Sequence, residues 1–151
     1  MLARNPALRL IDVTHLVPPQ DILEGAFQLA TVWHVFPLGT VHLAVVDPGV
    51  GTTRRAVAVL ADGQFFVLPD NGLVTFILDE VRSVQAWSLD RGEFHRHPVS
   101  ATFHGRDIFG PVAAALASGT PPDQIGTPVD PATLERLPVP ALELAQEAVR
   151  A

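Results

Sequence analysis

A carboxylate and two guanidinium groups lie close together in the stretch HLAVVDPGVGTTRR, residues 42–55. The apolar run before Asp47 predicts a buried strand that ends there, because Pro48 has no N–H to give to a ladder. In open α/β sheets, ligands bind at the carboxyl ends of strands. Paired with Arg54 or Arg55, Asp47 could orient a polar ligand or a water molecule. The alternative is a tight turn in which Asp47 only caps backbone amides.

A histidine stands at a second candidate position, in the segment Phe103-His104-Gly105-Arg106-Asp107. It comes just before a predicted helix, where backbone N–H donors and an imidazole suit the handling of water or an anion. We expect Arg106 and Asp107 to serve the fold instead. An aspartate at a helix start interacts favourably with the helix dipole, and an arginine there can bridge to a neighbour.

The turn Asp70-Asn71-Gly72 is the third candidate. The side chains of Asp70 and Asn71 could read a base or a ribose. They could equally make an Asx turn with no ligand involved.

The remaining histidines carry weaker signals. His34 falls on a predicted helix, and His95 and His97 fall in a polar loop, where lone histidines are usually structural or exposed. Carboxylate and imidazole ligands suit zinc or manganese, and one conceivable set is Asp12, His15, His42, Asp47 and His104. No H-x-x-x-H or similar spacing supports that set, so we expect no metal.

Bulk properties exclude several classes of protein. The 151 residues suit one domain with a sizeable core, and 48% hydrophobic with 17% charged residues indicates a folded chain. A net charge of −6 without a run of Lys or Arg argues against a nucleic-acid partner. The absence of cysteine excludes disulfides and thiol nucleophiles. With no signal-peptide pattern and no membrane-length apolar run, we expect a cytoplasmic protein without a membrane partner.

Helix and strand signals place the candidate residues at strand and helix ends. Leu8 to Val13 predicts a first strand, a capping-box pattern at Asp21 begins a helix to about Val35, and the strand that ends at Asp47 follows. This β-α-β order favours a parallel pair.

Four further elements follow along the chain. Two β-prone runs, residues 56–60 and 64–68, flank Asp62-Gly63 as a hairpin. Then come a short helix over 73–78, a strand over 81–89, and an Ala-rich helix in the second half of 102–119 that ends at Gly119. We therefore predict an α/β fold with a mostly parallel central sheet flanked by helices, in three layers.

Proline punctuates the chain after Gly119. This composition leaves room only for short helical turns, apart from a last run over 142–150 that could be helical. We therefore divide the chain into a catalytic-type α/β domain, residues 1–120, and a Pro-rich tail, residues 121–151.

Four motifs in order carry a family resemblance: DVTH (12–15), FPLGTVHLAVVDPGVGTTRR (36–55), LPDNG (68–72) and TFHGRDIFGPVAAALASG (102–119). Together they resemble the S-adenosyl-L-methionine hydroxide adenosyltransferases, once called DUF62, which are related to the bacterial fluorinase and chlorinase. The resemblance runs from about Leu10 to Gly119. Long motifs in register are a far more specific signal than any one of them.

The resemblance implies a reaction in which water or hydroxide attacks the ribose C5′ of S-adenosylmethionine, releasing adenosine and methionine. The family's water-activating set maps onto Asp47, Arg54 and His104, and which of them takes the proton stays open. The resemblance implies no cofactor, a small-molecule substrate and a homotrimer. Expected substrate-binding residues are Phe103 and Gly105, which would line the nucleophile pocket, with Asp70 and Asn71. The histidine favours water over halide as nucleophile.

This sequence also departs from the family pattern. A TDFG-like first strand, whose aspartate is expected to hold the ribose hydroxyls, is missing before Met1, and the C-terminal β-barrel domain is missing after Ala151. We therefore expect the 151-residue chain to keep the nucleophile-activating half and to bind S-adenosylmethionine weakly. The alternatives are a non-catalytic nucleoside-binding or assembly module and, with less support, a metal-dependent hydrolase.

Overall fold

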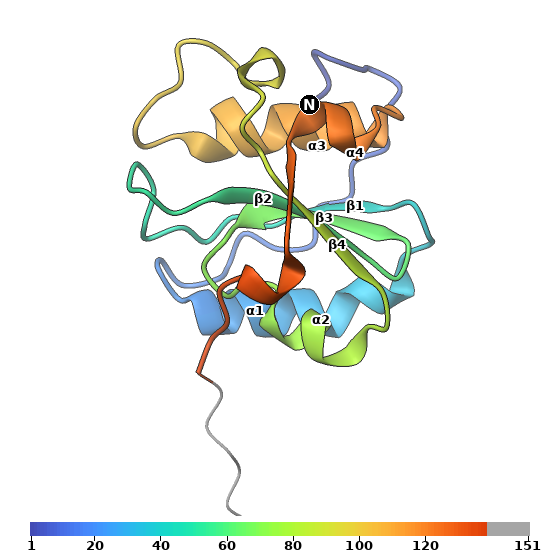
Figure 1. Cartoon of the computed structure of the whole chain (residues 1–151), viewed down its shortest axis with the longest axis vertical. Helices are drawn as coiled ribbons and strands as arrows, with labels where there is room; N and C mark the ends of the chain where they lie inside the picture. The colour runs from blue at the N-terminus through green and yellow to red at the C-terminus, as the bar shows by residue number, and fades with distance from the viewer. Residues whose placement is uncertain (139–151) are drawn as a thin grey trace, which may run out of the picture.

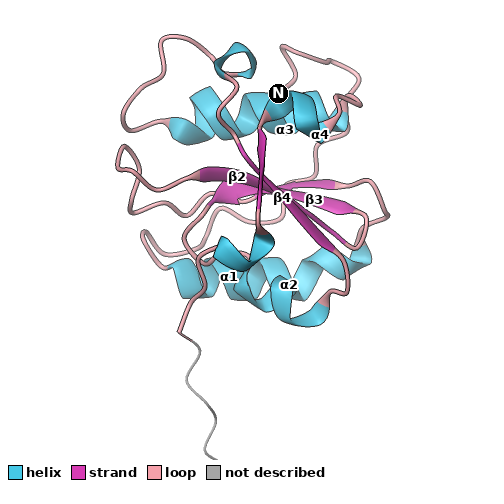
Figure 2. Ribbon diagram, viewed as in Figure 1, coloured by secondary structure: helices cyan, strands magenta, loops and turns pink. Residues whose placement is uncertain are grey.

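A five-stranded sheet lies between two layers of helices in the computed structural model, which describes residues 1–138 (Figure 1). Helices α1 (Ile22–Val32) and α2 (Thr75–Glu80) cover one face, and α3 (Gly110–Ala117) and α4 (Pro122–Ile125) cover the other (Figure 2). The predicted α/β class, with a central sheet between helices in three layers, is confirmed. In this described part, no helix has the length and apolar content that crossing a membrane requires.

The strands run in the order β1-β3-β2-β4-β5. Their bounds are β1 Val41–Leu43, β2 Ala56–Ala61, β3 Gln64–Pro69, β4 Val84–Ser88 and β5 Thr127–Val129. Of the four pairings among residues 1–138, β1 with β3 is parallel and the other three are antiparallel. The sheet is mixed, so the prediction of a mostly parallel sheet was wrong.

The β2–β3 connection explains much of this difference. Asp62 and Gly63 both adopt positive φ (42° and 84°), the backbone of a two-residue hairpin turn. Such a turn makes its two strands antiparallel. This hairpin is confirmed, and the predicted strand after it forms as β4, antiparallel to β2.

The predicted first strand, Leu8–Val13, was wrong. No strand pairs with this segment in residues 1–138, and β1 lies at the edge of the sheet. Leu10, Ile11 and Val13 remain 50%, 56% and 49% exposed. An apolar extended run becomes a strand only where its backbone groups find ladder partners, so the expected β-α-β pair does not form.

Helix α1 begins where its sequence signal predicts. The Asp21 carboxylate accepts the N–H of Glu24 (2.9 Å) at the helix start, and a 3₁₀ turn over Trp33–Val35 continues from the end of α1. The helix packs tightly on the sheet side, since a Cβ on Gly25 would lie 2.9 Å from side-chain atoms of Leu73 and Val46. The predicted helix over Asp21–Val35 is therefore confirmed.

The side chains of β2 and β3 point alternately to the two faces of the sheet, so the core has two parts. Side chains on one face of these strands pack toward α1 and α2; they are Val57, Val59, Ala61, Phe66 and Leu68. Side chains on the other face pack against α3; they include Ala58 and Val67, which meet Phe109, Val112 and Ala113. Successive side chains of a strand point to opposite faces, which is why these runs are apolar throughout.

The residues after Gly119 belong to the same packed unit. Ile125 on α4 is fully buried, β5 pairs with β4, and Leu134 is 6% exposed against the core. Packing therefore does not break at residue 120, where we predicted a tail to begin. The predicted helical run over 142–150 lies outside the described residues.

Candidate active site

A tight turn after β1 brings Asp47 and Arg54 face to face. The predicted buried strand up to Asp47 was wrong in extent, because β1 ends at Leu43 and Leu43 and Val45 are 39% and 41% exposed. In the turn that follows, Thr52 N–H donates to the Gly49 carbonyl (3.1 Å). The Thr52 hydroxyl donates to that carbonyl (2.7 Å) and accepts the N–H of Arg54 (3.3 Å). These bonds close the turn and fix the backbone position of Arg54.

Asp47 and Arg54 form a forked ion pair. Arg54 Nε donates to Asp47 Oδ1 (2.8 Å), and Arg54 Nη2 donates to Oδ2. The side chains are only 5% and 11% exposed, so little water competes for the pair. The partner of Asp47 is thus Arg54, whereas the sequence left Arg54 and Arg55 open.

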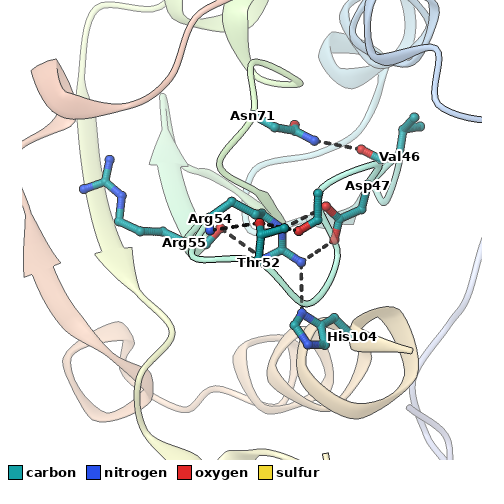
Figure 3. Close-up of polar contacts among 8 residues, drawn as sticks. Val46, Asp47, Thr52, Arg54, Arg55, Asn71 and His104 are labelled. Atoms are coloured by element: carbon teal, nitrogen blue, oxygen red, sulfur yellow. Dashed lines mark hydrogen bonds and ion pairs between the residues drawn. The ribbon is translucent and has the colours of Figure 1, made fainter. Parts of the chain in front are cut away.

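His104 completes the group from 50 residues further along the chain. Arg54 Nη2 donates to His104 Nδ1 (3.0 Å), so one guanidinium bridges the carboxylate and the imidazole (Figure 3). A guanidinium has no acceptor, so Nδ1 accepts and the neutral imidazole carries its proton on Nε2. The three side chains expected to converge do so.

Arg54 is also held from its other side. Its Nη1 donates to the Arg55 carbonyl (3.2 Å), and its guanidinium carbon lies 5.2 Å from the centre of the buried Phe109 ring. An aromatic face attracts a cation at this distance. The guanidinium is therefore oriented by four neighbours before any ligand arrives.

A π-helical segment, Gly105–Phe109, follows His104 and leads into α3. It was not predicted, although π turns are frequent at functional sites. Next to it, the Phe103 ring is 58% exposed with the Arg106 guanidinium 5.1 Å from its centre, and Gly105 faces Val45. Both proposed pocket residues thus flank His104 directly.

Arg106 and Asp107 hold each other. Arg106 donates to both carboxylate oxygens of Asp107 (2.6 and 2.8 Å), and the Ser100 N–H donates to Asp107 Oδ2 (3.0 Å). The Arg106 guanidinium, followed by that backbone N–H, holds the pKa of the Asp107 carboxyl well below its ordinary value. The predicted structural role of this pair agrees with these contacts.

Asp70 and Asn71, in the turn after β3, make different contacts. Asp70 accepts Arg55 Nε (2.7 Å) and the N–H of Glu135 (2.8 Å), so it ties β3 to the segment after β5. Asn71 donates to the Val46 carbonyl (2.9 Å), and its buried Oδ1 has no partner in the described chain. Asp70 is engaged by the protein, whereas Asn71 keeps a free acceptor.

A cavity of about 690 Å³ opens beside this group. Arg54, Arg55 and Asn71 line it together with Thr52, Thr53 and Thr133. Its wall is polar and includes Arg54, the residue that bridges Asp47 and His104. Of the three residues in the hydrogen-bonded group, Arg54 alone is among the described residues that line this cavity.

Comparison with known proteins decides the family. Residues 1–126 match the model of the SAM hydroxide adenosyltransferase N-terminal domain. The chain belongs to this family. The resemblance carried by the four sequence motifs is confirmed.

Three similar proteins illustrate the breadth of this SAM hydroxide adenosyltransferase family. An (R)-S-adenosyl-L-methionine hydrolase from Salinispora tropica is 53% identical, over 93% of this chain and 54% of its own length. A fluorinase from Nocardia brasiliensis is 28% identical, over 83% and 50%. A crystal structure of an uncharacterized conserved protein from Thermotoga maritima superposes with a TM-score of 0.85 at 38% identity, over 90% and 52%. The chain spans about half the length of the curated relatives it matches.

The conceivable metal set is not assembled in this family member. Asp12 and His15 lie 3.2 Å apart on the surface, while His42 is buried against Phe66. Among residues 1–138, no group of three or more His, Cys, Asp or Glu side chains could hold a metal ion. The site is organised around the Arg54 guanidinium instead.

His42 has a structural role in the core. Its ring stacks on Phe66 with centroids 4.8 Å apart, and its Nε2 donates to Gln64 Oε1 (2.7 Å). Burial lowers the pKa of His42 below its ordinary value of 6.5, and the bond to Gln64 offsets only part of that effect.

A His42→Phe variant should have a flatter dependence of stability on pH. Because the folded pKa is lowered, the unfolded state binds more protons below about pH 6.5, and wild-type stability falls as pH falls through that range. Chemical denaturation at about pH 7.5 and about pH 5.5 measures the change for each protein. Equal changes in both would contradict this role of His42, and a uniform loss at both pH values reflects only the unpaired Gln64.

Proposed function

We propose that this chain supplies the water-activating part of an enzyme that hydrolyses S-adenosyl-L-methionine to adenosine and L-methionine. The observation that carries the proposal is the Arg54 guanidinium, which joins the Asp47 carboxylate and the His104 imidazole in one hydrogen-bonded group beside a polar cavity. The relative at 53% identity, named as a hydrolase of this substrate, supports it.

The reaction needs a positioned water more than a strong base. The water oxygen forms a bond to the ribose C5′, the C5′–S bond breaks, and its electron pair leaves with the sulfur of methionine. One proton of the water is released. The sulfonium is already a good leaving group, so an in-line, partly desolvated water supplies much of the rate.

The hydrogen-bond pattern assigns a role to each residue. Since His104 Nδ1 accepts from Arg54, its Nε2–H is the donor available to hold the water oxygen. The Asp47 carboxylate keeps unused lone pairs after accepting twice from Arg54, so it accepts the hydrogen that the water gives up. Arg54 holds the carboxylate and the imidazole in place for this step, while its own charge is balanced by Asp47.

The substrate-binding residues remain those that flank this group. We assign the exposed Phe103 ring and Gly105 to the nucleophile side, and Asn71, which lines the cavity, to a polar group of the nucleoside. Asp70 acts on the cavity wall through Arg55, since its carboxylate is occupied by Arg55 and Glu135.

The expected assembly follows from the family resemblance. We propose a homotrimer in the cytoplasm. Analytical ultracentrifugation of the protein tests the trimer, and a monomer at all concentrations contradicts it.

An adenosine-release assay tests the function. The chain is incubated with millimolar S-adenosylmethionine, so that weak binding does not hide turnover, in water labelled with heavy oxygen. We expect adenosine and methionine in equal amounts, with the label in the 5′ hydroxyl and no effect of a chelator. Adenosine no faster than the spontaneous rate overturns the proposal, as does label in any other product.

A further inference from the structure

One loop connects the two halves of the site. Arg54 belongs to the turn after β1, and His104 belongs to the segment before α3, directly after loop 100–103. A Cβ on Gly51 would lie 2.5 Å from the Ala101 carbonyl oxygen. The turn and the loop therefore touch backbone to backbone, and only glycine fits at that contact, where φ is +80°.

Asp107 fixes the other side of this loop. Its carboxylate is fully buried and accepts the N–H of Ser100 (3.0 Å) in addition to the fork from Arg106. Its backbone carbonyl accepts the N–H of Arg96 (2.7 Å), and its own N–H donates to the Phe103 carbonyl (3.0 Å). These bonds span both sides of His104 and hold the chain around it.

We propose that Asp107 is a positioning residue for His104: by holding loop 100–103 against Gly51, it sets the distance between the His104 imidazole and the Arg54 guanidinium. The effect of this role on catalysis rests on the proposed function. The contact between His104 and Arg54 that Asp107 controls can nevertheless be measured without turnover. An amide at this position leaves one acceptor for Ser100 and Arg106 in place of two, so loop 100–103 loses part of its anchor while we expect the α3 core around Val112 and Ala113 to stay packed.

The contacts distinguish positioning from general support of the fold. The side-chain partners of Asp107 in the described chain, Ser100 and Arg106, lie on either side of His104 in the same segment. An aspartate that served only stability would lower the unfolding midpoint and leave the Arg54–His104 hydrogen bond unchanged. A displacement of about 1 Å at a reacting group costs up to about 10²-fold in rate, so small loop movements matter here.

The test uses the whole 151-residue chain and an Asp107→Asn variant. Long-range proton–nitrogen NMR spectra of the histidine side chains report whether His104 Nδ1 accepts a hydrogen bond and which nitrogen is protonated. We expect wild type to show a single Nε2–H form, and the variant to show mixed tautomers. In the adenosine assay, we expect kcat to fall about tenfold or more while KM stays nearly constant.

Two further variants make the result decisive. Gly51→Ala disturbs the same loop from the opposite side and should give the same change in the His104 signals, so it serves where Asp107→Asn fails to fold. Ile77→Ala, buried on α2 across the sheet, should lower the unfolding midpoint without changing those signals.

The outcomes separate the two proposals. Unchanged His104 signals and unchanged kcat in Asp107→Asn or Gly51→Ala overturn the positioning role. Signals that change in a chain without turnover support positioning and contradict the hydrolase function. Signals that change equally in Ile77→Ala show general loosening, which also overturns the positioning role.

Discussion

An Arg54→Lys variant is expected to lose about 10²–10³-fold in kcat for adenosine formation, the loss that typically follows removal of one preorganised donor. Lysine keeps the positive charge but is a point donor without the planar fork. It cannot hold both oxygens of Asp47 and His104 Nδ1 together, as Arg54 does. KM should change much less, since the bridge holds the water and not the nucleoside.

Arg55→Lys is the matched control for this variant. Arg55 is the next residue and also pairs with an aspartate, through Oδ2 of Asp70, but it points toward Thr133 and away from His104. We expect it to lower the unfolding midpoint and to cost far less turnover. Similar losses of kcat in both variants would show that the whole turn had been disturbed and that the bridge has no special role.

A Phe109→Ala variant is expected to lose about 3–5 kcal/mol of unfolding free energy, the usual cost of truncating a buried phenylalanine. The ring has no exposed surface and packs between the sheet and α3. It also supports the Arg54 guanidinium at 5.2 Å. The same change should therefore loosen the site in whatever fraction of the protein still folds.

Phe66→Ala separates these two effects. Phe66 is equally buried but lies on the opposite face of the sheet, against α1 and α2. Urea denaturation should show a similar loss of stability, whereas kcat per folded molecule should fall only in Phe109→Ala. A site that behaves alike in both variants contradicts the supporting role of Phe109.

Local signals predicted local structure well. The cap at Asp21 and the hairpin at Asp62-Gly63 depend on residues within four positions of one another, and both form as expected. Strand pairing depends on contacts between distant segments, and there the predictions failed. Two features cannot be recognised from a local stretch of sequence: the antiparallel pairing of β2 with β4, and the absence of pairing at Leu8–Val13.

The site was predictable for two different reasons. Asp47 and Arg54 are seven residues apart on one Gly-rich turn, so elementary chemistry suggested an ion pair. His104 joined them only through the family resemblance, because nothing in its own segment points to Arg54. Three features arise from tertiary packing and were not predictable from sequence signals. They are the π-helical segment, the contact of Gly51 with Ala101, and the free Oδ1 of Asn71.

Most N–H donors of Arg54 are already hydrogen-bonded, and this affects how the site discriminates between water and small anions. Of its five N–H groups, four are already committed in the described chain, to both oxygens of Asp47, to His104 Nδ1 and to the Arg55 carbonyl. A chloride or fluoride ion entering here would meet a cation whose charge is neutralised by Asp47, and would find one donor to bind. Molar salt should therefore compete poorly with water at this site. The Asp47 carboxylate disfavours the binding of small anions next to Arg54.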